Sequence, residues 1–189
     1  MITSFLNSTP WLWPALAIAV AVSLALFRPL ARALHAPRVA ALLILLGLTG
    51  IVALTLTPGE DAFAPYLFQD CFVRLVPPIG VGRVLNFGER GLNVLLFIPL
   101  GLGLGLLPGS RVKVGLVGAA LVLPFAIEAF QYLVPALDRS CSTVDVIDNL
   151  TGLIVGLAVG LAGRLVVSHG QRGGGPGRSV GELGAGDGP

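Results

Sequence analysis

Residues 146–167 read VIDNLTGLIVGLAVGLAGRLVV, and this run sets the architecture expected of the chain. After Thr151 it is apolar except for one arginine, and about 20 apolar residues in a helix are enough to cross a bilayer. Four glycines, at positions 152, 156, 160 and 163, let a second helix approach closely. The run therefore predicts a membrane-spanning helix packed against another helix.

The rest of the chain has the same character. It is 54% hydrophobic and only 12% charged, with a mean hydropathy of +0.89, whereas about a quarter of the residues of a soluble domain are charged. Four further apolar stretches of spanning length begin at Trp11, Val39, Gly91 and Val114. The composition predicts an all-α, polytopic membrane helix bundle of about five transmembrane helices.

The bundle is expected to form one domain over residues 1–167. Residues 168–189 are rich in glycine and polar residues, which is typical of a disordered tail. The net charge is only +2, and the basic residues form no run that could follow a phosphate backbone, so no nucleic-acid partner is predicted.

The distribution of the basic residues predicts the orientation. The segments that connect the five spans alternate between the two sides of the membrane, and eight of the 12 basic residues fall on the side that holds the tail. Cytoplasmic segments carry an excess of Lys and Arg, so the C-terminus is expected in the cytoplasm and the N-terminus outside. The other side holds four basic residues, namely Arg74, Arg83, Arg90 and Arg139.

Nearly every polar residue in or beside the last three spans falls near the outer ends of the helices in this topology. Within each span they lie three or four residues apart, which places them on one helix face. Ionised groups are costly in lipid, so these faces are expected to turn inward to a shared polar cavity. Asp138 and Asp148 are expected to be solvated instead. The candidate ligand-binding residues are Asn93, Glu128, Gln131, Arg139, Asp145 and Asn149.

Cys71 and Cys141 are the only cysteines, and both fall in segments assigned to the outside. An oxidising exterior permits a disulfide between them, and two unrelated buried thiols are the alternative. His35 and His169 are both assigned to the cytoplasmic side, so the outer cluster lacks the usual ligands of a zinc site. No metal site and no cofactor is predicted.

The same residues carry a resemblance to a known family. The pattern Asn93-Val-Leu-Leu-Phe-Ile-Pro-Leu-Gly101, then Glu128-x-x-Gln131, Arg139, and Asp145-x-x-x-Asn149-x-x-Gly152-x-x-x-Gly156 resembles the VanZ-like family of small bacterial membrane proteins. The resemblance covers about residues 86–163 and leaves out the first two spans and the tail. The family takes its name from a member linked to teicoplanin resistance, so the resemblance implies a role in the bacterial cell envelope and a place in the plasma membrane.

Three hypotheses follow for the outer cluster. In the first, it binds a lipid-linked wall precursor or a glycopeptide antibiotic, with Arg139 on an anionic group and the other residues donating or accepting hydrogen bonds, and it contributes to glycopeptide tolerance. In the second, Glu128 and Asp145 act as acid and base of an intramembrane enzyme with a lipid-linked substrate. In the third, the polar groups only hold the helices together in a structural or assembly protein. Membrane lipid is the expected partner in each case.

Overall fold

The computed structural model describes residues 11–58, 70–84, 88–137 and 140–173. Five of its helices are long and apolar enough to cross a membrane. The predicted all-α polytopic membrane bundle is therefore confirmed. The five helices are α2 (Leu12–Ala33), α3 (Arg38–Thr55), α5 (Glu89–Leu106), α6 (Arg111–Leu133) and α7 (Thr143–Gly173).

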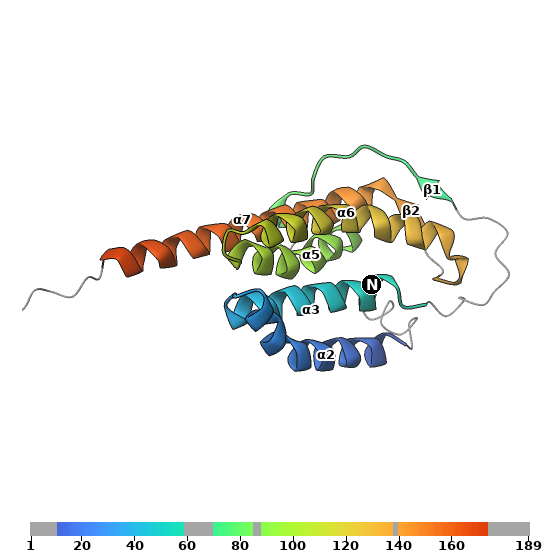
Figure 1. The fold of residues 1–189 in the computed structure, drawn as a ribbon. Helices are drawn as coiled ribbons and strands as arrows, with labels where there is room; N and C mark the ends of the chain where they lie inside the picture. The colour runs from blue at the N-terminus through green and yellow to red at the C-terminus, as the bar shows by residue number, and fades with distance from the viewer. Residues whose placement is uncertain (1–10, 59–69, 85–87, 138–139, 174–189) are drawn as a thin grey trace, which may run out of the picture.

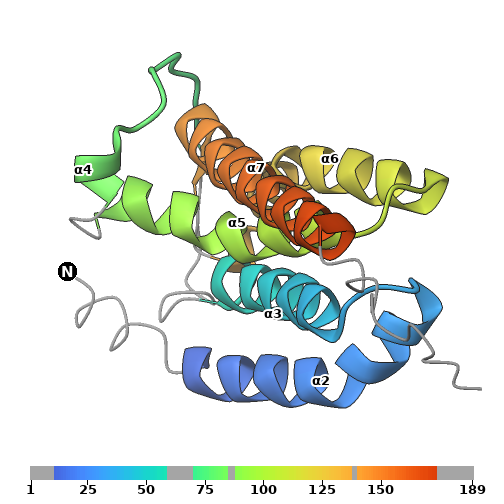
Figure 2. The ribbon, with the colours of Figure 1, turned by 90° about the vertical axis from the view of Figure 1, so that its left-hand side faces the viewer.

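Four short elements join these helices. They are the strand β1 (Cys71–Phe72), the single-turn helix α4 (Val81–Val84), the 3-10 helix η1 (Pro135–Leu137) and the strand β2 (Cys141–Ser142). β1 and β2 pair in parallel, with Cys71 opposite Cys141. The long helices are arranged with α2 on α3, α3 on α5 and α5 on α7, while α6 lies against α7 (Figures 1 and 2).

The interface between α5 and α7 is the most extensive in the bundle. The two helices run in the same direction, and glycines allow their backbones to meet. A Cβ atom on Gly105 would lie 2.6 Å from the carbonyl oxygen of Leu157, and one on Gly152 would overlap the carbonyl oxygen of Val94. Glycine is required at these positions because any side chain would push the helices apart. Gly101, Gly156 and Gly160 make equally close approaches to the facing backbone.

The glycine pattern of α7 thus behaves as predicted at three of its four positions. Gly163 is the exception, because nothing lies within 4 Å of a Cβ atom built on it. α5 ends at Leu106 and does not extend far enough to lie opposite Gly163.

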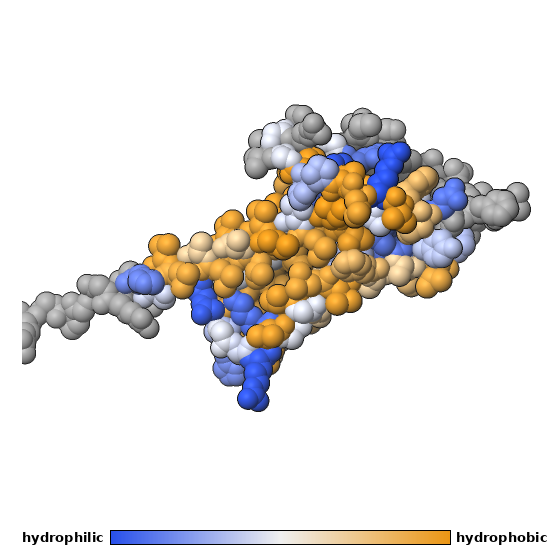
Figure 3. Space-filling model, turned by 90° about the horizontal axis from the view of Figure 1, so that it is seen from above, coloured by the Kyte–Doolittle hydropathy of each residue, from blue (hydrophilic) through white to orange (hydrophobic). Residues whose placement is uncertain are grey.

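Apolar side chains fill the centre of the bundle between α3, α5 and α7. Phe97 and Ile51 are fully buried, and Leu104 and Leu153 are 2% exposed. The outward faces of the helices are also apolar, as in α2, where Ile18 and Leu24 are more than half exposed. Hydrophobic residues cover the length of the helices and hydrophilic residues gather toward the two ends (Figure 3), which is the pattern of a bundle surrounded by lipid.

The last helix is longer than the sequence pattern predicts. α7 continues through Gly173 and projects past its neighbours (Figure 1), so residues 168–173 of the expected tail are helical. Extending an existing helix adds one hydrogen bond for each residue fixed, which is far easier than starting a new one. The remainder of the expected tail, 174–189, lies outside the described residues.

Candidate functional site

Buried polar side chains gather at one end of the bundle, where α3 and α6 end and α5 and α7 begin. Asp148 is fully buried, and Asn149, Gln131 and Glu128 are 3%, 6% and 7% exposed. A polar group removed from water destabilises a fold unless it finds a hydrogen-bond partner. The partners of these four side chains therefore define what the site can do.

Arg90 at the start of α5 forms an ion pair with Asp148 on α7. Its Nε donates to Oδ2 and its Nη2 donates to Oδ1, both over 2.7 Å. This two-pronged geometry is the strongest that a guanidinium and a carboxylate can adopt. Nη2 also donates to the carbonyl oxygen of Pro77 over 3.1 Å, so Arg90 ties the segment before α4 to the bundle.

The prediction that Asp148 is solvated is wrong. The side chain has no exposed surface, because it turns toward α5 and meets Arg90. Arg90 was not among the predicted site residues and was counted only among the basic residues expected outside. A usable signal was present: Arg90 lies three residues before Asn93 and Asp148 three residues after Asp145, so each shares a helix face with a residue of the predicted site.

Asn93 and Asp145 form a second link between the same two helices. The Nδ2 atom of Asn93 donates to Oδ1 of Asp145 over 2.8 Å. Together with the pair of Arg90 and Asp148, this bond places two carboxylates of α7 against donors from α5. The structure therefore brings these two predicted site residues together.

The polar residues of α6 reach in two other directions. Glu128 accepts a hydrogen bond from the backbone N–H of Ser142 over 2.7 Å, just before α7 begins. Gln131 donates through Nε2 to the carbonyl oxygen of Thr55 over 3.0 Å, at the last residue of α3. One turn of α6 thus connects the end of α3 to the start of α7.

A disulfide between Cys71 and Cys141 fastens the segment before α4 to the same end. The Cα atoms are 4.5 Å apart, within the range that a disulfide spans, so the structure pairs the two cysteines that the sequence left as an open alternative. Thr143 adds a further link, because its hydroxyl accepts from the N–H of Arg74 over 2.8 Å and donates to the carbonyl of Arg74 over 2.7 Å.

Asn149 differs from the other buried polar residues of the cluster in its hydrogen bonding. Of the buried side-chain nitrogen and oxygen atoms in the described part of the chain, its Oδ1 is the one without a hydrogen-bond partner. A buried carbonyl acceptor without a donor costs about 1 to 3 kcal/mol. The atom can therefore accept a hydrogen bond from a donor outside the described residues.

Apart from Oδ1 of Asn149, the buried side-chain nitrogen and oxygen atoms of the described residues have hydrogen-bond partners. Two hollows lie at the opposite end of the bundle, around the turn between α2 and α3. No group of three or more His, Cys, Asp and Glu side chains suited to a metal ion occurs in residues 11–58, 70–84, 88–137 and 140–173. Arg139, predicted to hold an anionic group, lies outside the described residues.

These features define a polytopic helical membrane protein with a polar cluster at one end of the bundle. The chain belongs to the VanZ/LLP1 family, whose model matches residues 42–164. The match begins further upstream than the resemblance over residues 86–163 indicated and includes most of α3. The contact between Gln131 and Thr55 gives a physical reason, since α3 contributes backbone to the polar cluster. Comparisons with curated proteins and with solved structures found no match.

Proposed function

We propose that this VanZ/LLP1 protein binds an amphiphilic molecule of the bacterial cell envelope, a lipid-linked wall precursor or a glycopeptide antibiotic, at the polar end of α5, α6 and α7. In this role it contributes to tolerance of teicoplanin. The proposal includes the orientation that the basic residues predict, with the polar end outside the plasma membrane.

The observation that carries the proposal is the unpartnered Oδ1 of Asn149 within a cluster of otherwise bonded polar groups. A bundle that needed these groups only for packing would be more stable with an apolar residue at this position, because a buried acceptor without a donor destabilises the fold. Hydroxyl and amide N–H groups are abundant on wall precursors and glycopeptides. We infer that one of them donates to Asn149.

Two partly buried residues of the cluster, Asn93 and Asp145, are accessible to a ligand. A ligand can exchange the 2.8 Å hydrogen bond between them for bonds of its own. Arg139 lies in the sequence between α6 and α7 and offers a cation for a phosphate or carboxylate.

A structural role is the second candidate, and a specific observation favours it. Arg90 with Asp148, Glu128 with Ser142 and Gln131 with Thr55 are bonds inside the chain that connect four helices. Such links can fix how helices pack without any ligand. The two functions make different predictions for Asn149, because only a binding role requires its free acceptor.

The test is the substitution Asn149→Leu, which keeps the approximate volume and removes the acceptor. The chain is expressed in a teicoplanin-sensitive bacterium, and the inhibitory concentration of teicoplanin and the thermal unfolding of purified protein are both measured. The binding role predicts that Asn149→Leu loses the added tolerance while the unfolding temperature stays the same or rises. Thr151→Val on the same helix is the control, since the Thr151 hydroxyl bonds only to the backbone of its own helix.

Unchanged tolerance in Asn149→Leu would contradict the binding role and favour the structural one. Incubation of purified protein with a lipid-linked precursor, followed by mass spectrometry, addresses the chemistry. A binding protein returns the precursor intact, whereas a changed mass that disappears in Glu128→Gln would show that the site is enzymatic.

A further inference from the structure

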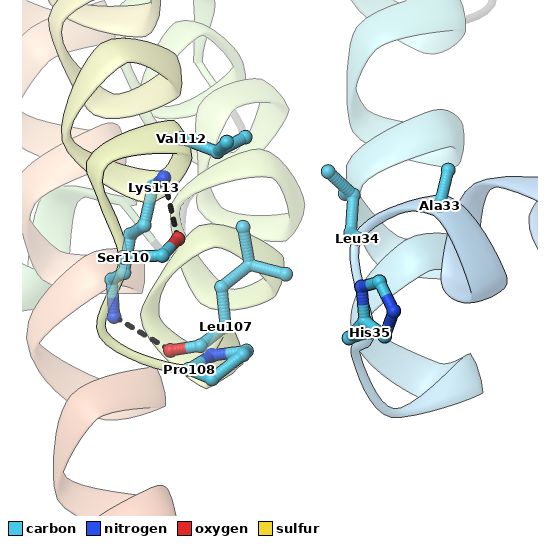
Figure 4. A pocket seen from close by; sticks show the side chains of 8 residues that line it. All are labelled: Ala33, Leu34, His35, Leu107, Pro108, Ser110, Val112 and Lys113. Carbon is cyan, nitrogen blue, oxygen red and sulfur yellow. Dashed lines mark hydrogen bonds between the residues drawn. The ribbon is translucent and has the colours of Figure 1, made fainter.

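The end of the bundle opposite the polar cluster carries a second, oppositely charged feature. Two neighbouring hollows lie there around the turn between α2 and α3, and His35 lines both of them. One, of about 200 Å³, separates this turn from the loop between α5 and α6 (Figure 4). The other, of about 700 Å³, is lined by Arg28, Ala31, Arg32, His35, Ala36 and Arg38; we call it the arginine hollow.

The charges of the described residues are divided between the two ends. Every described acidic residue lies at the end of the polar cluster, namely Asp70, Glu89, Glu128, Asp145 and Asp148. The end with the arginine hollow has basic residues and, within the described chain, no acid to neutralise them. The field at this end therefore attracts anions.

The arginines of the hollow have no partner within the described chain that would compete for an anion. Arg32 and Arg38 make no side-chain hydrogen bond or ion pair there, and Arg28 lies over the ring of Phe27, 5.6 Å from its centroid. Lys113, at the same end of the bundle, differs from these arginines. Lys113 donates to the carbonyl oxygens of Gly105 and Leu107, each over 3.0 Å, and so closes the end of α5.

His35 adopts a backbone conformation that is uncommon for residues other than glycine. Its φ is 49°, in the left-handed region, and it follows the end of α2 in a Schellman motif. The N–H of Ala36 donates to Ala31 O over 3.0 Å and the N–H of His35 donates to Arg32 O over 3.2 Å. Glycine is the usual residue at this position because it has no Cβ atom. An imidazole is therefore held at the hollow where the backbone itself favours glycine.

The surface that leads to the hollow suits a lipid chain. Val20, Leu24, Arg28 and Arg32 follow one another at intervals of one helical turn along α2, and Val20 and Leu24 are 47% and 56% exposed. An apolar strip thus runs along the membrane-spanning part of α2 and ends in two guanidinium groups. A free anion has no use for the apolar strip, whereas a lipid uses both parts.

We propose that the arginine hollow binds the phosphate of an anionic membrane lipid, held by Arg28, Arg32 and Arg38 with His35 beside it, while an acyl chain lies along Val20 and Leu24. The site is at the opposite end of the bundle from the proposed envelope-ligand site and does not depend on it. It anchors the hairpin of α2 and α3 in the leaflet on that side.

The test uses the full-length protein purified in detergent and native mass spectrometry to count bound lipid. Dioleoyl phosphatidylglycerol is the probe, and dioleoyl phosphatidylcholine has the same chains without the net charge. We expect the anionic lipid to be retained about tenfold more tightly, and Arg32→Gln or Arg38→Gln to weaken it about fivefold each. Arg111→Gln is the matched control, since Arg111 is exposed at the same end and does not line the hollow.

His35→Gly separates binding from folding. Glycine adopts the left-handed conformation freely, so this variant is expected to unfold at the same or a higher temperature and still to lose at least twofold in affinity for phosphatidylglycerol. Equal retention of the two lipids, or an equal loss in Arg111→Gln, would overturn the proposal. Displacement of phosphatidylglycerol by millimolar inorganic phosphate would also overturn it, because the hollow would then be a site for free phosphate.

Discussion

Arg90 and Asp148 face each other across the helices α5 and α7, with two nitrogen-to-oxygen distances of 2.7 Å. The carboxylate is fully buried, whereas the arginine side chain is 31% exposed. Because of this difference, Arg90 can still contact water when Asp148 is removed, whereas Asp148 stays buried when Arg90 is removed.

Replacing the arginine is expected to be worse than replacing the aspartate. Arg90→Gln leaves a buried carboxylate without its cation and should lower the free energy of unfolding by roughly 3 kcal/mol. Asp148→Asn leaves a cation that can turn toward water, and should cost less. Thermal unfolding in detergent measures the stability of both single variants, and the double variant completes a double-mutant cycle that gives the coupling between the two residues. Equal effects of the two single changes, adding fully in the double variant, would show that the pair is not coupled.

The close contact of α5 and α7 can be tested with one added methyl group. Gly152→Ala places a Cβ atom against the carbonyl oxygen of Val94 and should destabilise the bundle by about 1 to 3 kcal/mol, as other overpacked sites do. Gly163→Ala on the same helix meets nothing within 4 Å and should be neutral or slightly stabilising. Similar unfolding temperatures for the two variants would contradict the packing described.

The disulfide should contribute to stability through the long loop it closes. Cys71 and Cys141 are 70 residues apart in sequence, and a loop of that length corresponds to about 4 kcal/mol in the chain-entropy description. The reductant-treated protein and Cys71→Ser with Cys141→Ser are expected to unfold at a similar, lower temperature than the oxidised protein. Mobility on a non-reducing gel reports the bond itself, and labelling of both thiols before reduction would contradict it.

Lys113 should stabilise the end of α5. Lys113→Met removes two hydrogen bonds from the ammonium group to the carbonyl oxygens of Gly105 and Leu107, which should cost roughly 2 kcal/mol. Arg111→Met removes a neighbouring exposed charge that makes no such bonds, and serves as the control. A loss of stability that is the same in both variants would point to overall charge instead of the two carbonyl contacts.

The orientation predicted from the basic residues can be read by labelling. In a chain without its native cysteines, Leu75→Cys lies in an exposed position at the end with the polar cluster, since Leu75 is 94% exposed. Ser168→Cys lies on the exposed last turns of α7. An impermeant maleimide applied to intact cells should label the first and reach the second only after permeabilisation. The reverse pattern would place the polar cluster in the cytoplasm and remove its access to envelope ligands from outside.

The general layout of the candidate site was predictable because helical spacing places residues three and four positions apart on one face. Asn93, Asp145, Glu128 and Gln131 all lie at the same end of the bundle, as predicted from where the spans begin and end. The partner of each was not predictable. Hydrogen-bond partners depend on how far each helix is rotated about its axis, and that rotation is a property of the packed bundle.

Asp148 and Gly163 are two further residues whose surroundings could not be predicted from the local sequence. Asp148 is a charged residue near the start of a helix, where a position in solvent is expected. In the bundle it instead faces α5, where it is buried against Arg90. Gly163 continues a pattern of small residues, yet α5 ends before reaching it and leaves the position open. In each case the neighbouring helix, not the local pattern, determines the role of the residue.

The primary structure alone established five membrane spans, the division of charge between the two ends and the place of the polar residues along each helix, because each of these depends on composition and spacing within one segment. The packed bundle was needed to show that Arg90 meets Asp148, that Cys71 meets Cys141 and that the oxygen of Asn149 has no donor. These are relations between segments that lie far apart in the chain, and they depend on how the helices and loops pack against one another; for Arg90 and Asp148 the glycines of α5 and α7 allow the two backbones to come together.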